Sequence, residues 1–391
     1  MRLLEIETFG RGGLTHYAYS LSWALARRGH EVTLLTGASY ELEDLPSPSS
    51  PSGQSTKVDE AGSVEVVKLF SRWTWKRGAS GVLGSLARKF EAIYDGFALL
   101  WRVRRLRPDL VHLHCTNPVA WLYLELLRFC GCPVIATAHV VTPHEPIRFQ
   151  KTIYRRLHHA SALVIAHSEV DRARLLTEFA VPESRTRVIP HGEYSFLGES
   201  DTPVDRQAER RALGFDEESE VVLFFGYLRE YKGLDLLLEG WPRVAEARPQ
   251  ARLLIVGDPV QLPEGRRQEL QTWADRLGAV SRFEFIPLED IARYFAAADL
   301  LAMPYRRISQ SGVLFLAISV GVPVVATQVG ALPEMLTEGE SALLVPPEDS
   351  AAFADAVVRV LEDPALRERL AAGGREVAAQ HSWESIAERT E

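Results

Sequence analysis

Short apolar runs alternate with amphipathic stretches along the whole chain. The first run, 3–7, leads into the glycine turn 10–13, and apolar residues then recur at helical spacing until Gly29. Nearly continuous runs of this length are typical of parallel strands buried on both faces. In the first half such runs cover 3–7, 31–36, 64–70, 110–114, 134–138 and 162–166.

The same alternation starts again after a polar stretch at 198–220. Its apolar runs cover 221–226, 252–258, 283–286, 300–303, 323–327 and 342–345. Strands that alternate with helices in this way predict doubly wound α/β domains. The sequence therefore predicts two Rossmann-like parallel-sheet domains that face a central cleft, with a boundary near residue 198. Ligands of such sheets bind beyond the carboxyl ends of the strands.

Composition narrows the class of protein. A chain of 391 residues is long enough for two cores, and its net charge of −8 argues against nucleic-acid binding. Three cysteines, an odd number, favour reduced thiols in a cytoplasmic protein. The uncharged run 308–333 contains glycines and a proline, so we expect a buried helix and strand there and not a membrane span. No secretory signal is expected at 2–6.

Two loops after strands have the chemistry of phosphate binding. Gly12 and Gly13 open a helix, where backbone N–H groups and the helix dipole attract anions; a turn needed only for packing is the alternative. The second loop, 226–233, begins with Gly226 and holds Arg229 and Lys232 before another helix. Two cations with backbone amides can hold a diphosphate without a metal, although solvated charges at a helix start are the alternative.

His139 directly follows the run 134–138. A histidine at the end of a strand can donate a hydrogen bond to a sugar hydroxyl or to a developing charge. A purely structural histidine is the alternative.

Taken in order, these motifs resemble the family-4 glycosyltransferases. The resemblance also includes Gly321–Thr327, Gly330–Glu334 and Ser382–Glu384, and it runs from end to end of the chain. It implies a GT-B fold with an N-terminal domain at 1–197, a nucleotide-sugar domain at 198–370, and a last helix at 371–391 that packs back on the first domain. It implies retaining transfer from a UDP- or GDP-linked sugar, with no cofactor and no metal.

The resemblance also assigns roles to residues. Gly12 and Gly13 would meet phosphate or sugar, His139 the donor sugar, Lys232 with Arg229 the leaving diphosphate, and Ile286 the base. The family usually places arginine where Tyr227 stands, and two glutamates where Ile308 and Leu316 stand. A subset of such enzymes resembles this chain in its Ser-Gly-Val-Leu segment. In that subset Gln310, Ser311 and the amides of Gly312 and Val313 would meet the sugar or phosphate at a helix start.

Two other classes of function remain open. The chain could be a non-catalytic sugar-nucleotide-binding or scaffolding partner, or a nucleotide-sugar hydrolase or epimerase on the same fold. The segment 68–107 bears on the acceptor. It contains ten lysines and arginines but only two acidic residues, with tryptophans between them. This pattern suits anionic lipid headgroups, so we expect peripheral contact with the inner membrane face and a glycan or lipid-linked acceptor. An ordinary helix with core tryptophans is the alternative.

Overall fold

The computed structural model describes residues 1–42, 64–71, 81–114, 118–141, 150–194, 204–259 and 262–391. Contacts divide the chain into two compact units, Met1–His191 with Trp383–Glu391, and Gly192–Ser382. Residues 72–80 of the basic segment 68–107 lie outside the described residues, and so does one of the three cysteines, Cys115.

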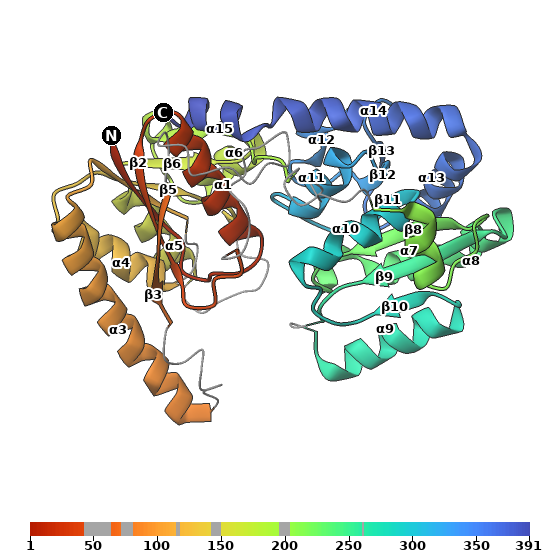
Figure 1. Ribbon diagram of the computed structural model, residues 1–391, viewed down its shortest axis with the longest axis horizontal. Coiled ribbons are helices and arrows are strands. Elements are labelled where there is room, and N and C mark those ends of the chain that lie inside the picture. Colours follow the sequence, from red (N-terminus) through yellow and green to blue (C-terminus); the bar gives the residue numbers. More distant parts are fainter. Residues whose placement is uncertain (43–63, 72–80, 115–117, 142–149, 195–203, 260–261) are drawn as a thin grey trace. The chain divides into compact units, whose positions relative to one another are not determined.

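The first unit is built on a parallel sheet of strands in the order β3-β2-β1-β4-β5-β6-β7 (Figure 1). Its strands are β1 (Arg2–Ile6), β2 (Glu31–Gly37), β3 (Val64–Phe70), β4 (Leu110–Leu113), β5 (Val134–Thr137), β6 (Leu163–Ala166) and β7 (Thr186–Val188). Its helices are α1 (Gly13–Arg27), α3 (Gly81–Leu106), α4 (Pro118–Arg128), α5 (Gln150–Ala160), α6 (Glu169–Thr177), η1 (Glu183–Arg185) and α15 (Trp383–Thr390).

Both faces of this sheet are covered, as the apolar runs require. Leu4 of β1 packs in a core cluster with Leu99 of α3, whereas its neighbour Leu3 packs in a second cluster with Tyr17 of α1 and Ile386 of α15. Successive strand residues point to opposite faces, so a strand between two helical layers needs apolar residues at every position.

The second unit repeats this design with the strand order β10-β9-β8-β11-β12-β13 (Figure 1). Its strands are β8 (Glu220–Phe225), β9 (Ala251–Val256), β10 (Val280–Arg282), β11 (Leu300–Met303), β12 (Val324–Thr327) and β13 (Leu343–Val345). Its helices are α7 (Arg206–Ala212), η3 (Glu230–Lys232), α8 (Leu234–Ala247), α9 (Glu264–Arg276), α10 (Leu288–Ala297), α11 (Gly312–Ser319), α12 (Leu332–Met335), α13 (Ser350–Glu362) and α14 (Pro364–Gln380).

The structure differs from the sequence-based expectation in three places. The run 283–286 is not a strand; β10 lies just before it, at Val280–Arg282. Strand β7 was not expected. Of the expected helix 371–391, residues up to Gln380 belong to α14 of the second unit, and α15 alone joins the first unit.

Candidate active site

A buried lysine lies in the loop between β8 and α8. Gly226 (φ +100°) follows β8 and Gly233 (φ +68°) precedes α8, and both take backbone angles that side chains with a Cβ disfavour. Lys232 is only 7% exposed. Its Nζ donates to the Phe225 carbonyl oxygen at 3.3 Å and lies 5.4 Å from the Tyr305 ring centroid. The loop therefore holds an ammonium group beneath its own glycine.

The environment of Lys232 disfavours its charged form in the free protein. Burial, and after it the Arg229 guanidinium, lower the pKa of Lys232 to about 7. The guanidinium of Arg229 lies 5.5 Å from the Tyr227 ring, and its buried Nε has no hydrogen-bond partner among the described residues. Two neighbouring cations with unused donors favour an anion, which would restore the full charge of Lys232.

The start of α11 lies against this loop. A methyl group on Gly226 would lie 2.6 Å from Lys232 Nζ and 3.1 Å from Val313 Cγ2. Ser311 caps the helix, because its Oγ accepts from Leu314 N at 3.2 Å. Gly312 and Val313 are half-buried in the first turn, directly after the half-buried Gln310. The structure thus brings Gly226, Arg229, Lys232, Ser311, Gly312 and Val313 together.

The positions where the family usually has glutamates are apolar and buried. Ile308 and Leu316 are 5% and 4% exposed and belong to one core cluster of the second unit. Neither side chain can accept a hydrogen bond from a ribose or a sugar. These two side chains therefore offer a ligand no hydrogen bond.

Ile286 stands apart from this group in the chain. It is half-buried two residues before α10 and packs against the same core cluster. Its backbone follows Phe285, whose ring is 47% exposed. The structure places Ile286 on a segment between β10 and α10, and its contact with a base stays a prediction.

In the first unit, the glycine loop is occupied by a carboxylate of the same chain. Gly12 is the N-cap of α1, with φ +76°, and Gly13 is the first residue of the helix. Gly12 N donates to Glu41 Oε1 at 2.5 Å, and His16 Nε2 lies 2.8 Å from the same oxygen. Burial raises the pKa of Glu41, but His16 and the amide of Gly12 outweigh it and lower the pKa overall. The loop therefore binds an anion in the free protein, namely Glu41.

A second carboxylate shapes the same loop. Glu7 directly follows β1, is fully buried, and accepts from Gly10 N and from Thr36 Oγ1, each at 2.9 Å. Burial raises its pKa more than these hydrogen bonds lower it. Neither Glu7 nor Glu41 was among the residues predicted from the sequence motifs. The position of Glu7, between a strand and a glycine turn, was the available signal.

His139 lies just past β5, half-buried, and both of its ring nitrogens have partners. Its Nε2 is 3.4 Å from His114 Nδ1, and its Nδ1 is 3.1 Å from His167 Nε2. Burial, and then the neighbouring histidines, lower its pKa well below the usual value. The ring is therefore neutral and fixed in place at the end of the strand.

One buried group of residues has the composition of a metal site. Among the residues that the structure describes, Glu5, His112 and His114 bring three ligand atoms within 4.8 Å of one another. A carboxylate and two imidazoles suit zinc or another transition metal. Glu5 Oε2 lies 3.1 Å from His112 Nδ1 and 2.5 Å from His114 Nε2, so all three groups are already in mutual contact.

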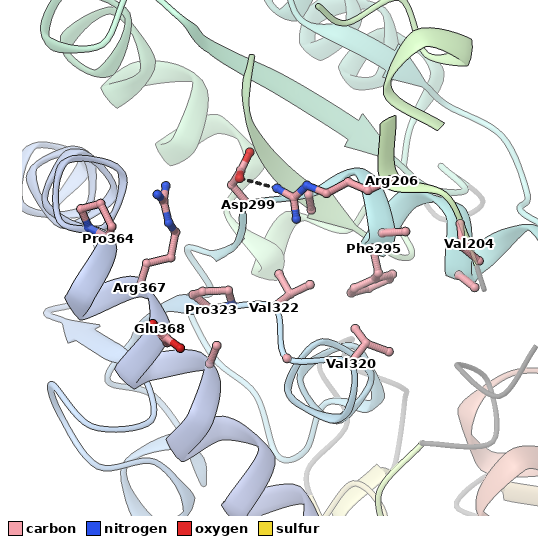
Figure 2. A pocket seen from close by; sticks show the side chains of 15 residues that line it. Val204, Arg206, Phe295, Asp299, Val320, Val322, Pro323, Pro364, Arg367 and Glu368 are labelled. Carbon is pink, nitrogen blue, oxygen red and sulfur yellow. Dashed lines mark hydrogen bonds and ion pairs between the residues drawn. The ribbon is translucent and has the colours of Figure 1, made fainter. Parts of the chain in front are cut away.

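A pocket of about 610 Å³ opens elsewhere in the second unit (Figure 2). It lies at the amino ends of the strands, since Asp299 precedes β11 and Pro323 precedes β12. Asp299 forms ion pairs with Arg206 and Arg210 and accepts from Val221 N at 2.7 Å. These contacts hold α7 to the sheet. The pocket is therefore at the opposite end of the strands from Lys232.

Comparisons with known proteins decide the family. The family model described as Glycosyltransferase Family 4 matches residues 11–192, and the one described as Glycosyl transferases group 1 matches residues 219–363. The D-inositol 3-phosphate glycosyltransferase of Geodermatophilus obscurus is 32% identical over 398 residues, which cover 95% of this chain and 82% of that protein. This chain belongs to the family-4 glycosyltransferases. The resemblance found in the sequence motifs is confirmed, and the chain is a glycosyltransferase.

A further curated relative and two solved structures are similar to this chain over most of their length. The D-inositol 3-phosphate glycosyltransferase of Corynebacterium efficiens is 28% identical, with 96% of this chain and 88% of that protein covered. HepE from Anabaena, solved with UDP and glucose, is 21% identical with a TM-score of 0.77. The match covers 100% of this chain and 98% of the HepE chain. WaaG, a glycosyltransferase of lipopolysaccharide biosynthesis, has a TM-score of 0.66 at 17% identity, with 100% and 98% covered. The predicted GT-B fold is confirmed.

Proposed function

We propose that this glycosyltransferase transfers a sugar from a UDP- or GDP-linked donor to a hydroxyl of a lipid-linked or glycan acceptor, with retention and without a metal ion. The observation that carries the proposal is the grouping of Lys232, Arg229 and the capped start of α11 at the carboxyl ends of the second sheet. Cations and aligned amides stabilise the negative charge that a departing nucleoside diphosphate develops.

In the proposed reaction, Lys232 and Arg229 neutralise the diphosphate as it leaves. Gln310, Ser311 and the amides of Gly312 and Val313 bind phosphate or sugar at the start of α11. The backbone of Ile286 meets the base, His139 meets the donor sugar, and the amide of Gly13 meets phosphate or sugar. The acceptor hydroxyl attacks on the face that the diphosphate vacates, so the anomeric configuration is kept.

The relatives support the donor class. HepE has been solved with UDP-glucose and with UDP and glucose, and it shares this fold over the whole chain. Several relatives are named for transfer to D-inositol 3-phosphate, an anionic acceptor. We therefore place a uridine nucleotide first among the donors.

Thermal-shift screening against UDP-, GDP- and ADP-sugars tests the donor. One nucleotide class should raise the melting temperature, because a ligand of the folded state stabilises it. The anomeric configuration of the product then tests retention. Donor binding with neither transfer nor hydrolysis would indicate a non-catalytic partner. Turnover of the donor that no acceptor increases would indicate a hydrolase or an epimerase.

The acceptor side of the proposal rests on the surface of α3. Five apolar residues, which we call the α3 apolar stripe, recur every three or four positions and are all exposed. They are Leu86 (46%), Phe90 (71%), Ile93 (50%), Phe97 (67%) and Trp101 (58%). The helix packs on the sheet through Leu99 and Val103 instead. The alternative interpretation, an ordinary helix with core tryptophans, is therefore wrong for Trp101.

Charge follows the same division. The two acidic residues of α3, Glu91 and Asp95, are 4% and 2% exposed and face inward. Cations remain on the outside: Lys89, Arg104 and Arg105 are exposed, and the Arg105 guanidinium lies 5.4 Å from the Trp101 ring centroid. An apolar stripe flanked by cations fits one occupant, the surface of an anionic bilayer.

None of the helices in the described part of the chain is long and apolar enough to cross a membrane. We therefore propose that α3 lies in the lipid interface, which brings a lipid-linked acceptor to the enzyme. Aromatic side chains and arginines at the headgroup level contribute together, the cations by about 1 kcal/mol each.

The variant Phe97→Glu/Trp101→Glu tests this surface. We expect at least a tenfold loss of co-sedimentation with phosphatidylglycerol vesicles, since two exposed aromatic rings that would enter the lipid are replaced by charges that the lipid repels. Activity on a soluble acceptor such as D-inositol 3-phosphate should change little. Phe285→Glu is the control, because Phe285 is 47% exposed but lies in the other unit. Wild-type protein that stays in the supernatant would remove the membrane from the proposal.

A further inference from the structure

The loop between β8 and α8, which we call the lysine loop, rests on the segment that follows β11. Arg306 N donates to the Tyr231 carbonyl oxygen at 2.7 Å. A methyl group on Gly233 would lie only 2.0 Å from the Pro304 carbonyl oxygen, so the two backbones are in direct contact there. This segment therefore fixes where the lysine loop, and with it Lys232, lies on the sheet.

The side chain of Arg306 binds the lysine loop as well. Its Nη1 donates to the Glu230 carbonyl oxygen at 3.0 Å and to Asp235 Oδ1 at 2.7 Å, and its Nη2 donates to Asp235 Oδ2 at 3.0 Å. Its Nε donates to Glu348 Oε1 at 2.9 Å. All three guanidinium nitrogens are therefore used within the protein, and this planar group joins the loop, the first turn of α8 and the turn before α13.

A second arginine binds the same carboxylates from α9. Arg266 Nε donates to Glu230 Oε1 and Arg266 Nη2 donates to Asp235 Oδ2, each at 3.0 Å. The pairs that Asp235 forms with the two arginines are shielded, since these three side chains are only 23–26% exposed. A shielded network of ion pairs holds its geometry better than an isolated pair on an open surface. We call the following side chains the arginine clamp: Glu230, Asp235, Arg266, Arg306 and Glu348.

The residue that holds Arg306 Nε has a strained backbone. The φ of Glu348 is +60°, and among the described residues of the second unit it is the only one besides glycine with a positive φ. A residue with a side chain rarely adopts this conformation unless the surrounding structure holds it there. The strain is retained where both carboxylate oxygens contact Arg306 Nε, at 2.9 and 3.2 Å.

The arginines of the clamp do not compete with Lys232 for the donor. Arg306 and Arg266 are each already bonded to two carboxylates of the clamp. Arg306 instead binds two consecutive carbonyl oxygens of the loop, those of Glu230 and Tyr231. A carbonyl oxygen only accepts hydrogen bonds, so one that turned toward a phosphate would repel it. The clamp therefore orders the loop and leaves Lys232 to bind the anion.

We infer that Arg306 is a positioning residue that holds the lysine loop in its donor-binding form before the donor arrives. It is anchored by Asp235 and Glu348, and it affects the donor only through Lys232. A loop that is ordered in advance needs no ordering when the ligand binds, so the donor binds more tightly than it would to a loose loop. This inference rests on the proposed function, in which Lys232 neutralises the diphosphate.

Arg306→Gln is the first test. Without the clamp the lysine loop loosens, and donor binding must order it again. We expect the donor Kd, measured by calorimetry, to rise roughly ten- to a hundredfold, the range of one charged hydrogen bond. The bound donor orders the loop, so kcat at saturating donor should stay within about threefold of wild type. Arg306→Lys keeps the charge without the planar fork, so its Kd should lie between the two.

The protonation of Lys232 tests the same variant without any substrate. In wild type, burial and after it Arg229 lower the pKa of this lysine to about 7. Once the loop loosens, the ammonium group reaches water, and its pKa should move back toward the ordinary value of 10.5. NMR of protein labelled with ¹³C-lysine measures this pKa, with the signal assigned from Lys232→Met.

Arg248→Gln is the matched control. Arg248 forms a pair of the same kind with Glu220, through Nε at 3.0 Å and Nη2 at 2.6 Å, and its side chain is 29% exposed. It lies at the opposite end of α8 from Lys232. It should lose a similar amount of stability, while the donor Kd and the pKa of Lys232 stay as in wild type.

A wild-type donor Kd in Arg306→Gln would overturn the inference, and if kcat alone fell, the arginine would act on the transition state instead. An unchanged pKa of Lys232 would also overturn it. If Arg306→Gln does not fold, Asp235→Asn removes the same salt bridge and is judged by the same two measurements. Should the protein bind no sugar nucleotide at all, a shifted pKa of Lys232 in the variant would still uphold the positioning role, and the proposed function alone would fail.

Discussion

Lys232→Met should raise the melting temperature of the free protein while it removes donor binding. Methionine fills nearly the same space without a charge. Replacing a buried ion pair by apolar residues often stabilises a protein by about 1–4 kcal/mol, and we expect a gain of that order when this buried cation, which has another cation beside it, is removed. For a unit of this size that is a rise of several degrees, at about 2–4 °C per kcal/mol. Transfer should fall by roughly a hundred- to a thousandfold, as when a group that stabilises developing charge is removed.

The pH dependence of stability is a second test of the buried charge of Lys232. The pKa of Lys232 is lowered from 10.5 to about 7 in the folded protein. Between these values the unfolded chain binds more protons than the folded chain, so the contribution of this group to stability rises as pH increases from 7 to 10.5. Lys232→Met should lose that rise.

Lys151→Met is the matched control, because Lys151 is exposed on α5. It should change neither the melting temperature nor the shift caused by the donor. A Lys232→Met protein that is less stable than wild type, or that keeps the full donor-induced shift, would contradict the placement of Lys232.

Gly226→Ala should abolish donor binding by a different route. The new methyl would lie 2.6 Å from Lys232 Nζ and 3.1 Å from Val313 Cγ2, so the lysine and the start of α11 must both move. The residue would also keep φ near +100°, which a side chain disfavours by about 1–2 kcal/mol. We expect donor affinity to fall at least tenfold, measured by calorimetry.

Gly214→Ala separates these two effects. Gly214 has φ +83° in the same unit, and a methyl there would meet nothing within 4 Å. It should show the loss of stability from backbone strain without the loss of affinity. Equal donor affinities in the two variants would show that the displaced lysine does not matter.

The sheets could be predicted because burial on both faces makes the strands continuously apolar. The same signal was wrong at 283–286. There Phe283 and Ile286 pack partly buried against two different core clusters from an irregular segment. A run of apolar side chains indicates that a segment is buried, but a buried segment need not be a strand. The α3 apolar stripe is the opposite case, since its residues recur at helical spacing but their side chains are exposed.

The site could be predicted only for residues that lie in the segment directly after a predicted strand. Gly226, Lys232 and Ser311 belong to segments at strand ends, so their grouping follows from the fold class. Glu41 reaches Gly12 from 29 residues away, and no local pattern connects them. Glu5 and His112 are neighbours only because β1 pairs with β4, strands that are far apart in the sequence.

The contact between Glu41 and Gly12 affects which anions can bind to the glycine loop. A small ion such as inorganic phosphate or sulfate would have to expel a tethered carboxylate that already bonds the amide and His16. A substrate that is anchored elsewhere can do so, because its other contacts offset the exchange. We therefore expect Glu41 to keep abundant free oxyanions out of the glycine loop. A ligand that is also bound elsewhere on the protein can displace it.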